Sequence, residues 1–285
     1  ATEPARQLYQ WLIEPLGSAL DGVETIVYAP DNQLRYIPLA ALYDGDRWLI
    51  ERFRINNITA ASLTNFKAQS PSNINLLAGA FANGFYSFQI GDRSFNLSGL
   101  SHAETEVKAL AETIRDTTLL VDRAFSPEAT VTQMNNYTIA HFATHAAFIP
   151  GHPADSFIMF GNGDRVTLQD VKKDASRWSF RNLDLVVLSA CETGLGGLGN
   201  GEEILGFGYL MQDAGAKASI ASLWAVSDGS TQVLMNAFYQ SLQQGLSKAE
   251  SLRQAQIALI TGSYLGAREE GTMTVNNSLD HPYYW

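Results

Sequence analysis

Short apolar runs alternate with segments of helical periodicity along most of the chain. Five runs have the length and composition expected of buried strands, and they lie at residues 74–80, 118–121, 137–148, 185–188 and 217–226. Between and after them, apolar residues recur at three- and four-residue spacing, which is typical of amphipathic helices. Strands that alternate with helices build a parallel sheet covered by helices. The pattern therefore predicts an α/β fold.

Two helices carry clear start signals. Ser101 is followed three residues later by Glu104, which is a capping-box pattern, and an apolar stripe then continues to Ile114. Ser126 and Pro127 form the second signal, because serine favours the N-cap and proline the first helical position. Further amphipathic helices are expected at the following places: from residue 202 onward, 230–242 and 247–260.

The pattern is more mixed before residue 70. It predicts the following elements: a helix at 5–13, a hairpin of strands 25–28 and 34–37 around a turn at 30–33, and a half-buried strand at 48–58. The polar stretch 67–73 is the best boundary candidate, since it contains Ser70-Pro71-Ser72. We therefore expect an N-terminal helix and hairpin entry subdomain at residues 1–70 and the main domain at residues 71–285.

Two stretches of the main domain lack a regular pattern. Residues 83–97 are rich in glycine, phenylalanine and serine, and are expected to form a surface excursion. Residues 149–174 contain several turn signals, and only 157–160 resembles a short strand. Irregular loops at the edge of a sheet often shape binding pockets.

Composition restricts the classes of function. Hydrophobic residues make up 46% and charged residues 17% of the 285 residues, as in a globular protein. The net charge of −10 disfavours binding to a phosphate backbone, since such proteins present a clustered positive face. No apolar run approaches the roughly 20 residues of a membrane span, and the first residues show no signal-peptide pattern. Neither nucleic acid nor a membrane is an expected partner.

The single cysteine, Cys191, follows the apolar run 185–188 and precedes a segment with five glycines among residues 194–201. One cysteine cannot form an internal disulfide, which fits a reducing compartment, and we expect a cytoplasmic location. A lone thiol is often a buried apolar group. This one, however, lies at the carboxyl end of a predicted strand, where open α/β sheets bind their ligands. Cys191 is therefore a candidate nucleophile.

Two histidines in the run 137–148 are candidates for the base that a thiol needs. His141 lies inside the run and is interpreted as a core histidine with a hydrogen-bond partner. His145 ends the run, and if the two strands are parallel neighbours its imidazole can reach Cys191. The histidines would be about 13 Å apart on an extended strand, at roughly 3.3 Å per residue, which is too far for joint metal binding. A Cys/His dyad with neither metal nor cofactor is thus the hypothesis.

These segments resemble a known family. Phe142-Ala-Thr-His145, Leu188-Ser-Ala-Cys191-Glu-Thr-Gly194, Ser222-Leu-Trp-Ala-Val226 and Arg35-Tyr-Ile-Pro-Leu-Ala-Ala-Leu42 are similar to motifs of CHAT domains, within the caspase-like clan of cysteine peptidases. The resemblance implies a caspase-like, mostly parallel sheet and a cysteine endopeptidase with His145 and Cys191 as its catalytic pair. It also implies an oxyanion hole made by the amides of Cys191 and Ala146, although many relatives carry glycine where Ala146 stands.

The resemblance extends to specificity. The segment Ser222-Leu-Trp-Ala-Val-Ser-Asp228 is similar to a run in the related separases whose second aspartate receives an arginine side chain. Asp228 is accordingly the candidate for the pocket that selects Arg, or Lys, before the scissile bond. The alternative is a helix N-cap, because Asp228 precedes a predicted helix. Ser189 stands where several relatives carry an acidic residue two positions before the nucleophile.

Partners and rival functions also follow from the resemblance. CHAT domains are often attached to tetratricopeptide repeats, so a regulatory repeat region or partner protein is expected beside the protein or peptide substrate. One alternative is a catalytically silent interaction module, since caspase-like folds can lose activity. Another is a nucleotide-binding domain, because Gly194, Gly196 and Gly199 match the dinucleotide fingerprint. Asn200-Gly201 delays the following helix, however, which weakens that match.

Overall fold

The structure is a computed structural model that describes residues 2–58, 73–149, 152, 154–189, 202–224, 226–264 and 279–285; for residues 202–207 and 228 it describes the backbone only. The chain divides into two compact units. The first comprises residues 1–64 and 233–285 and the second residues 65–232, so that the boundary falls within helix α7 (Asp228–Gln243). Among the described residues, no helix is long and apolar enough to cross a membrane.

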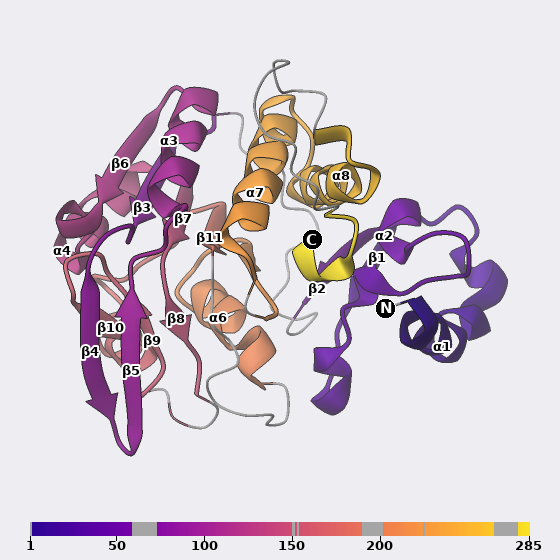
Figure 1. The fold of residues 1–285 in the computed structure, drawn as a ribbon, viewed down its shortest axis with the longest axis horizontal. Coiled ribbons are helices and arrows are strands. Elements are labelled where there is room, and N and C mark those ends of the chain that lie inside the picture. Colours follow the sequence, from indigo (N-terminus) through magenta and orange to yellow (C-terminus); the bar gives the residue numbers. More distant parts are fainter. Residues whose placement is uncertain are drawn as a thin grey trace. The chain divides into compact units, whose positions relative to one another are not determined.

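A five-stranded parallel sheet forms the centre of the second unit (Figure 1). Its strands, in spatial order, are β12 (Ser219–Ala221), β11 (Leu185–Ser189), β7 (Ile139–Ala143), β3 (Leu76–Ala80) and β6 (Thr117–Val121). All neighbouring pairs run parallel. From β3 the chain moves outward to β6 and then returns to β7 on the other side, so the topological switch point lies between β3 and β7. The predicted α/β fold with a mostly parallel sheet is confirmed.

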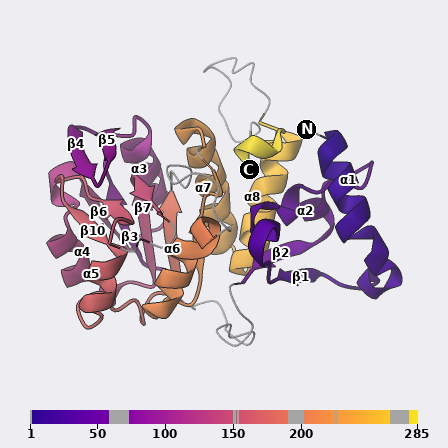
Figure 2. The ribbon, with the colours of Figure 1, turned by 90° about the horizontal axis from the view of Figure 1, so that it is seen from below.

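Helices cover both faces of this sheet (Figure 2). Helix α3 (Ala103–Thr113) packs on one face against β3, β6 and β7. Helices α4 (Pro127–Gln133), α5 (Leu168–Lys173) and α6 (Glu202–Asp213) lie on the other face. Alternate strand residues meet these helices in one core cluster, which includes Leu77, Phe142, Leu188, Val131, Leu168 and Met211. Burial on both faces explains why the strands are almost continuously apolar.

A hairpin and a small antiparallel sheet complete the second unit. The hairpin consists of β4 (Phe85–Ile90) and β5 (Arg93–Ser98), and the sheet has the order β10 (Arg165–Thr167), β9 (Phe157–Met159), β8 (Ala146–Ala147). Aromatic rings join the two: Phe88 and Phe95 stack at 5.3 Å, and both meet Phe157 edge-on.

The surface excursion expected at 83–97 is thus a hairpin with alternately exposed residues, whereas the expectation that 149–174 is irregular apart from 157–160 is wrong, because it also contains β10 and α5. Gly91, at φ +56°, opens the two-residue turn between β4 and β5, a position where glycine is free of strain. In the second stretch the side chain of Thr167 caps α5, and Asp170 completes a capping box by accepting from the Thr167 amide.

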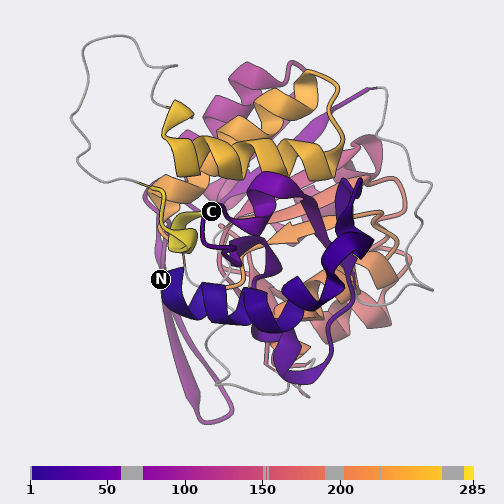
Figure 3. The same ribbon diagram turned by 90° about the vertical axis from the view of Figure 1, so that its right-hand side faces the viewer.

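The first unit is built from both ends of the chain. It contains α1 (Thr2–Leu12), β1 (Thr25–Tyr28), α2 (Leu49–Arg52), β2 (Arg54–Asn57) and α8 (Lys248–Thr261), with α1 and α8 on opposite sides of the α2–β2 segment (Figure 3). Arg253 of α8 donates to the main-chain oxygens of Ile50 and Glu51, and so ties the C-terminal helix to the segment that precedes β2.

Two predictions for this unit are wrong. Residues 34–37 do not pair with 25–28, because Asp31 accepts from the Asn32 amide and starts a 3₁₀ helix at Asn32–Tyr36. The partner of β1 is β2, in parallel. The predicted strand 48–58 begins instead with one turn of helix, in which Glu51 accepts from the Trp48 amide.

Of the two helix starts predicted from capping signals, one is confirmed and one is wrong. Ser126 accepts from the Ala129 amide, and Pro127 occupies the first position of α4, as expected. Helix α3, by contrast, starts at Ala103 after His102, with no side-chain cap bond, so Ser101 is not its cap. The division into domains 1–70 and 71–285 stays a prediction, because compactness alone does not test which segments fold independently.

Candidate active site

The two strands that lead to His145 and Cys191 are parallel neighbours. Residues Ile139–Ala143 of β7 pair with residues Leu185–Ser189 of β11, so that Ala143 lies directly opposite Ser189. The predicted adjacency of the strands is thus confirmed. His145 follows β7 by two residues, and Cys191 follows β11 by two. Cys191 itself lies outside the described residues, as does the Gly194–Gly199 loop of the nucleotide-binding alternative.

His145 is held by a main-chain carbonyl. Its Nε2 lies 2.7 Å from the oxygen of Ser98, the last residue of β5. A carbonyl oxygen can only accept, so Nε2 carries the hydrogen, and in the neutral ring the lone pair belongs to Nδ1. The ring of Phe81 contacts the imidazole edge-on, at a centroid distance of 5.9 Å, and His145 is only 8% exposed. The imidazole is therefore fixed in tautomer and in direction.

The residue before His145 ties this turn to two sheets. The amide of Thr144 donates to the main-chain oxygen of Ser189 at 3.2 Å, and its hydroxyl donates to the oxygen of Met159 at 2.7 Å. The Met159 amide in turn donates to the oxygen of His145 at 2.9 Å. The main chain of His145 is thus located by the end of β11 on one side and by β9 on the other.

Ala146, the predicted oxyanion donor, is the first residue of β8 and lies opposite Ile158 of β9. It is buried. Antiparallel pairing with β9 fixes the path of the chain directly after His145, as a preorganised backbone donor requires. The oxyanion role of the Ala146 amide stays a prediction, because the amide of Cys191 lies outside the described residues.

His141 has the partner expected of a core histidine. It is fully buried on β7, and its Nε2 lies 2.8 Å from Oε1 of Glu106 on α3. The hydroxyl of Ser189 donates to the same oxygen, also at 2.8 Å. The interpretation of His141 as a satisfied core residue is confirmed.

Glu106 and Ser98 were not found from the sequence. Glu106 follows Ala103 by three residues and precedes Leu110 by four, so it lies on the apolar stripe of α3, and a charged residue on that stripe was an available signal. Ser98 contributes only its main-chain oxygen, which leaves no mark in the sequence.

Asp228 is the first residue of α7, and its side chain is not described. The oxygen of Ser227 accepts from the amide of Thr231 and from the hydroxyl of Ser230, as at a helix start. Ser227 thus occupies the N-cap position, so the N-cap alternative for Asp228 is wrong, while its pocket role stays a prediction.

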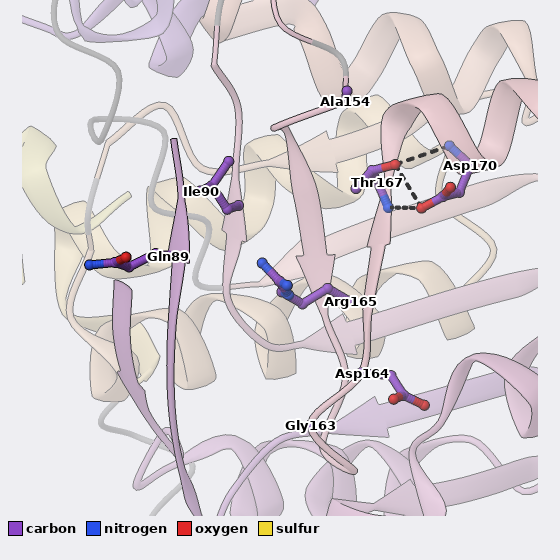
Figure 4. A pocket seen from close by; sticks show the side chains of 8 residues that line it. All are labelled: Gln89, Ile90, Ala154, Gly163, Asp164, Arg165, Thr167 and Asp170. Carbon is purple, nitrogen blue, oxygen red and sulfur yellow. Dashed lines mark hydrogen bonds between the residues drawn. The ribbon is translucent and has the colours of Figure 1, made fainter. Parts of the chain in front are cut away.

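A pocket of about 470 Å³ lies elsewhere on the second unit (Figure 4). Arg165 of β10 lies within it, between Gln89 and Ile90 of the hairpin and the Thr167–Asp170 capping box. The guanidinium of Arg165 lies 3.9 Å from the ring centroid of Phe88. Strand β9 separates β10 from β8, so this pocket is distinct from the edge at which His145 lies.

The CHAT-domain family model matches residues 2–285, almost the whole chain. The chain belongs to the CHAT-domain family. CHAT domains have a caspase-like, protease-related fold, which agrees with the parallel sheet and its flanking helices. Tetratricopeptide repeat protein 28 of Mus musculus is 24% identical over an alignment of 304 residues, which covers 90% of this chain. The chain therefore matches only 12% of the length of that protein.

Proposed function

We propose that this CHAT domain is a cysteine endopeptidase in which His145 and Cys191 form the catalytic dyad. The observation that carries the proposal is the register of β7 and β11, which end opposite one another at Ala143 and Ser189. Neighbouring strands lie about 4.8 Å apart. The residues that directly follow the ends of β7 and β11 therefore begin close enough for their side chains to meet. The edge in question is the carboxyl edge of the sheet beside the switch point, where α/β folds bind ligands.

The chemistry follows from the fixed tautomer of His145. With Nε2–H directed at the Ser98 oxygen, Nδ1 accepts the thiol proton, and the thiolate attacks the carbonyl carbon of the scissile peptide bond. The amides of Cys191 and Ala146 stabilise the oxyanion of the tetrahedral intermediate. His145 then returns the proton to the leaving amine, and water, with His145 as general base, hydrolyses the acyl-enzyme.

Covalent labelling tests the dyad. A peptidyl-arginine acyloxymethyl ketone should label wild-type protein at Cys191, and Cys191→Ala should remove all labelling. His145→Ala should slow it about 10²–10⁴-fold, the usual contribution of a general base. His152→Ala is the matched control, because the side chain of His152 is largely exposed and should leave labelling unchanged. Peptide cleavage that persists in Cys191→Ala would exclude the mechanism, whereas wild-type protein that is neither labelled nor able to cleave peptides would favour the silent interaction module.

Specificity for arginine is a separate part of the proposal and rests on Asp228. A carboxylate in the first specificity pocket pairs bidentately with a guanidinium and less well with an ammonium. The test compares cleavage rates for a library of substrates that differ only at the residue before the scissile bond. The wild type should cleave the arginine substrate fastest, and Asp228→Ala should lose this preference. Asp213→Ala, which removes an exposed carboxylate at the end of α6, is the control. An unchanged preference in Asp228→Ala would remove Asp228 from the pocket.

A tetratricopeptide-repeat region, in the same protein or in a partner, is the proposed regulator. The name of the mouse relative supports such an association. The expected effect of adding the repeat region is a change in the rate of ketone labelling, and equal rates with and without it would exclude this regulation.

A further inference from the structure

Three buried polar residues from three different elements meet on the α3 face of the parallel sheet. Oε1 of Glu106 (α3) lies 2.8 Å from Nε2 of His141 (β7) and accepts a 2.8 Å hydrogen bond from the hydroxyl of Ser189 (β11). At most 3% of any of the three residues is exposed. The carboxylate therefore joins the two strands that lead to His145 and Cys191.

The carboxylate of Glu106 connects β7 and β11 and also fixes their relative orientation. Burying a charged group costs several kcal/mol unless it is paired and hydrogen-bonded, and Glu106 meets that condition through His141 and Ser189. Apolar side chains could hold the strands together without this cost. Hydrogen bonds also fix angle and distance, so the network sets how the last residue of β11 lies relative to β7.

Ser189 is held at two points. Its side chain binds Glu106, and its main-chain oxygen accepts from the amide of Thr144, the residue before His145. A continuous series of hydrogen bonds therefore runs from α3, through the end of β11, to the turn that carries His145. Ser189 is also two residues before Cys191, so the direction in which the chain leaves β11 towards Cys191 depends on how Ser189 is held.

We propose that Glu106 is a positioning residue, which acts through Ser189 to hold the thiol of Cys191 in reach of the imidazole of His145. The proposal rests on the dyad proposed above. Glu106 itself touches neither substrate nor reacting atoms.

Alkylation of the single cysteine tests the positioning without using peptidase activity. Iodoacetamide at pH 6.5 reports on the thiol that the imidazole activates, and with one cysteine in the chain the signal comes from Cys191 alone. Ser189→Ala removes one hydroxyl and leaves the Glu106–His141 contact. Glu106→Gln keeps the shape and removes the charge. The matched controls are Glu104→Gln, at a carboxylate of α3 paired with Lys108, and Ser251→Ala, at an equally buried serine of α8 in the other unit.

Both test variants should slow alkylation about tenfold, since displacements of about 1 Å at a reacting group cost up to 10²-fold. The double variant Glu106→Gln/Ser189→Ala should be no slower than the slower single variant, because both act through one contact. In peptide cleavage kcat should fall while KM stays the same. Both controls should match the wild type.

The alkylation rates distinguish failure of the proposed dyad from failure of the positioning role of Glu106. Unchanged alkylation in His145→Ala would overturn the dyad itself. Slow alkylation in His145→Ala with wild-type rates in Ser189→Ala and Glu106→Gln would leave the dyad and overturn the positioning role. Lower thermal midpoints in these two variants, without slower alkylation of the folded protein, would assign Glu106 to stability alone.

Discussion

The main-chain oxygen of Ser98 lies 2.7 Å from Nε2 of His145, although 47 residues separate the two in sequence. Ser98 ends the β4–β5 hairpin, so the direction of the proposed base depends on where that hairpin ends. Backbone changes next to Ser98 should therefore alter activity.

Gly99→Ala is the most direct such change. A Cβ at Gly99 would lie 2.2 Å from the oxygen of Ala82, so the backbone beside Ser98 must shift. We expect a loss of about 1–3 kcal/mol in the free energy of unfolding from overpacking, and labelling at Cys191 at least about tenfold slower. Urea unfolding and the rate of ketone labelling measure the two effects.

Gly91→Asn, at the tip of the same hairpin, is the control for Gly99→Ala. A Cβ at Gly91 would meet no atom within 4 Å, and asparagine tolerates its positive φ. Labelling should stay close to the wild-type rate. A Gly99→Ala variant that labels as fast as Gly91→Asn would contradict the dependence of His145 on the hairpin end.

Asp122 holds the segment against which Gly99 packs. Its Oδ1 accepts from the amides of Ala82 and Asn83, both at 2.8 Å, and its φ is +51°. Asp122→Ala removes these bonds and places alanine in the left-handed region, so we expect a loss of about 2–3 kcal/mol in unfolding free energy. Asp122→Asn keeps an acceptor and tolerates the same φ, and should lose less than half as much. Equal losses in urea unfolding would show that the amide contacts contribute little.

The sequence predicts the sheet better than it predicts the surroundings of the sheet. Strands such as Leu76–Ala80 are buried on both faces, and their apolar runs are too short for typical buried helices, so that length and pattern together indicate strands. The hairpin β4–β5 exposes alternate residues, and glycine and serine dilute its pattern. Residues 34–37 are similarly ambiguous, because a single acceptor, Asp31, decides for a 3₁₀ helix.

In the candidate site, too, the strand residues can be predicted from the sequence and their contacts with other elements cannot. His145 can be found because it ends an apolar run, and α/β topology allows its strand to be a parallel neighbour of the strand before Cys191. The register that sets Ala143 opposite Ser189 comes only from the structure. The contact of Glu106 with His141 depends on how α3 crosses the sheet, which pattern and spacing do not give. The Ser98 contact depends on the length of a hairpin and uses a main-chain atom, so no residue type announces it.

The substitution Gly79→Ala tests how tightly β3 packs against the ring of Phe125. A Cβ at this position in β3 would lie 2.3 Å from the ring of Phe125, which is fully buried. Gly79→Ala should lose about 1–3 kcal/mol of unfolding free energy through overpacking. Phe125→Leu makes room, so the double variant should lose clearly less than the sum of the two single variants in urea unfolding. Additive losses would mean that the ring does not limit this position.

The carboxyl group of Asp44 should make the stability of the first unit depend on pH. Burial by itself would raise the pKa of Asp44, but the amides of Arg47 and Asp46 and the charge of Arg52 outweigh it and lower the pKa. A carboxyl group whose pKa is lower in the folded state stabilises that state at pH values above its ordinary pKa, and the stabilisation is lost as the pH falls through the lowered value. The test compares urea unfolding of Asp44→Asn and the wild type. At pH 7, Asp44→Asn should unfold at a lower urea concentration than the wild type. The two midpoints should converge as the pH falls through the lowered pKa of Asp44, where the wild-type carboxyl is protonated as well. Asp46→Asn, in the same turn but with an exposed carboxylate, is the control and should follow the wild type at every pH. If the gap between the unfolding midpoints of Asp44→Asn and the wild type keeps its size as the pH falls from 7 through the lowered pKa of Asp44, the effect comes from shape, because a charge effect must disappear with the charge.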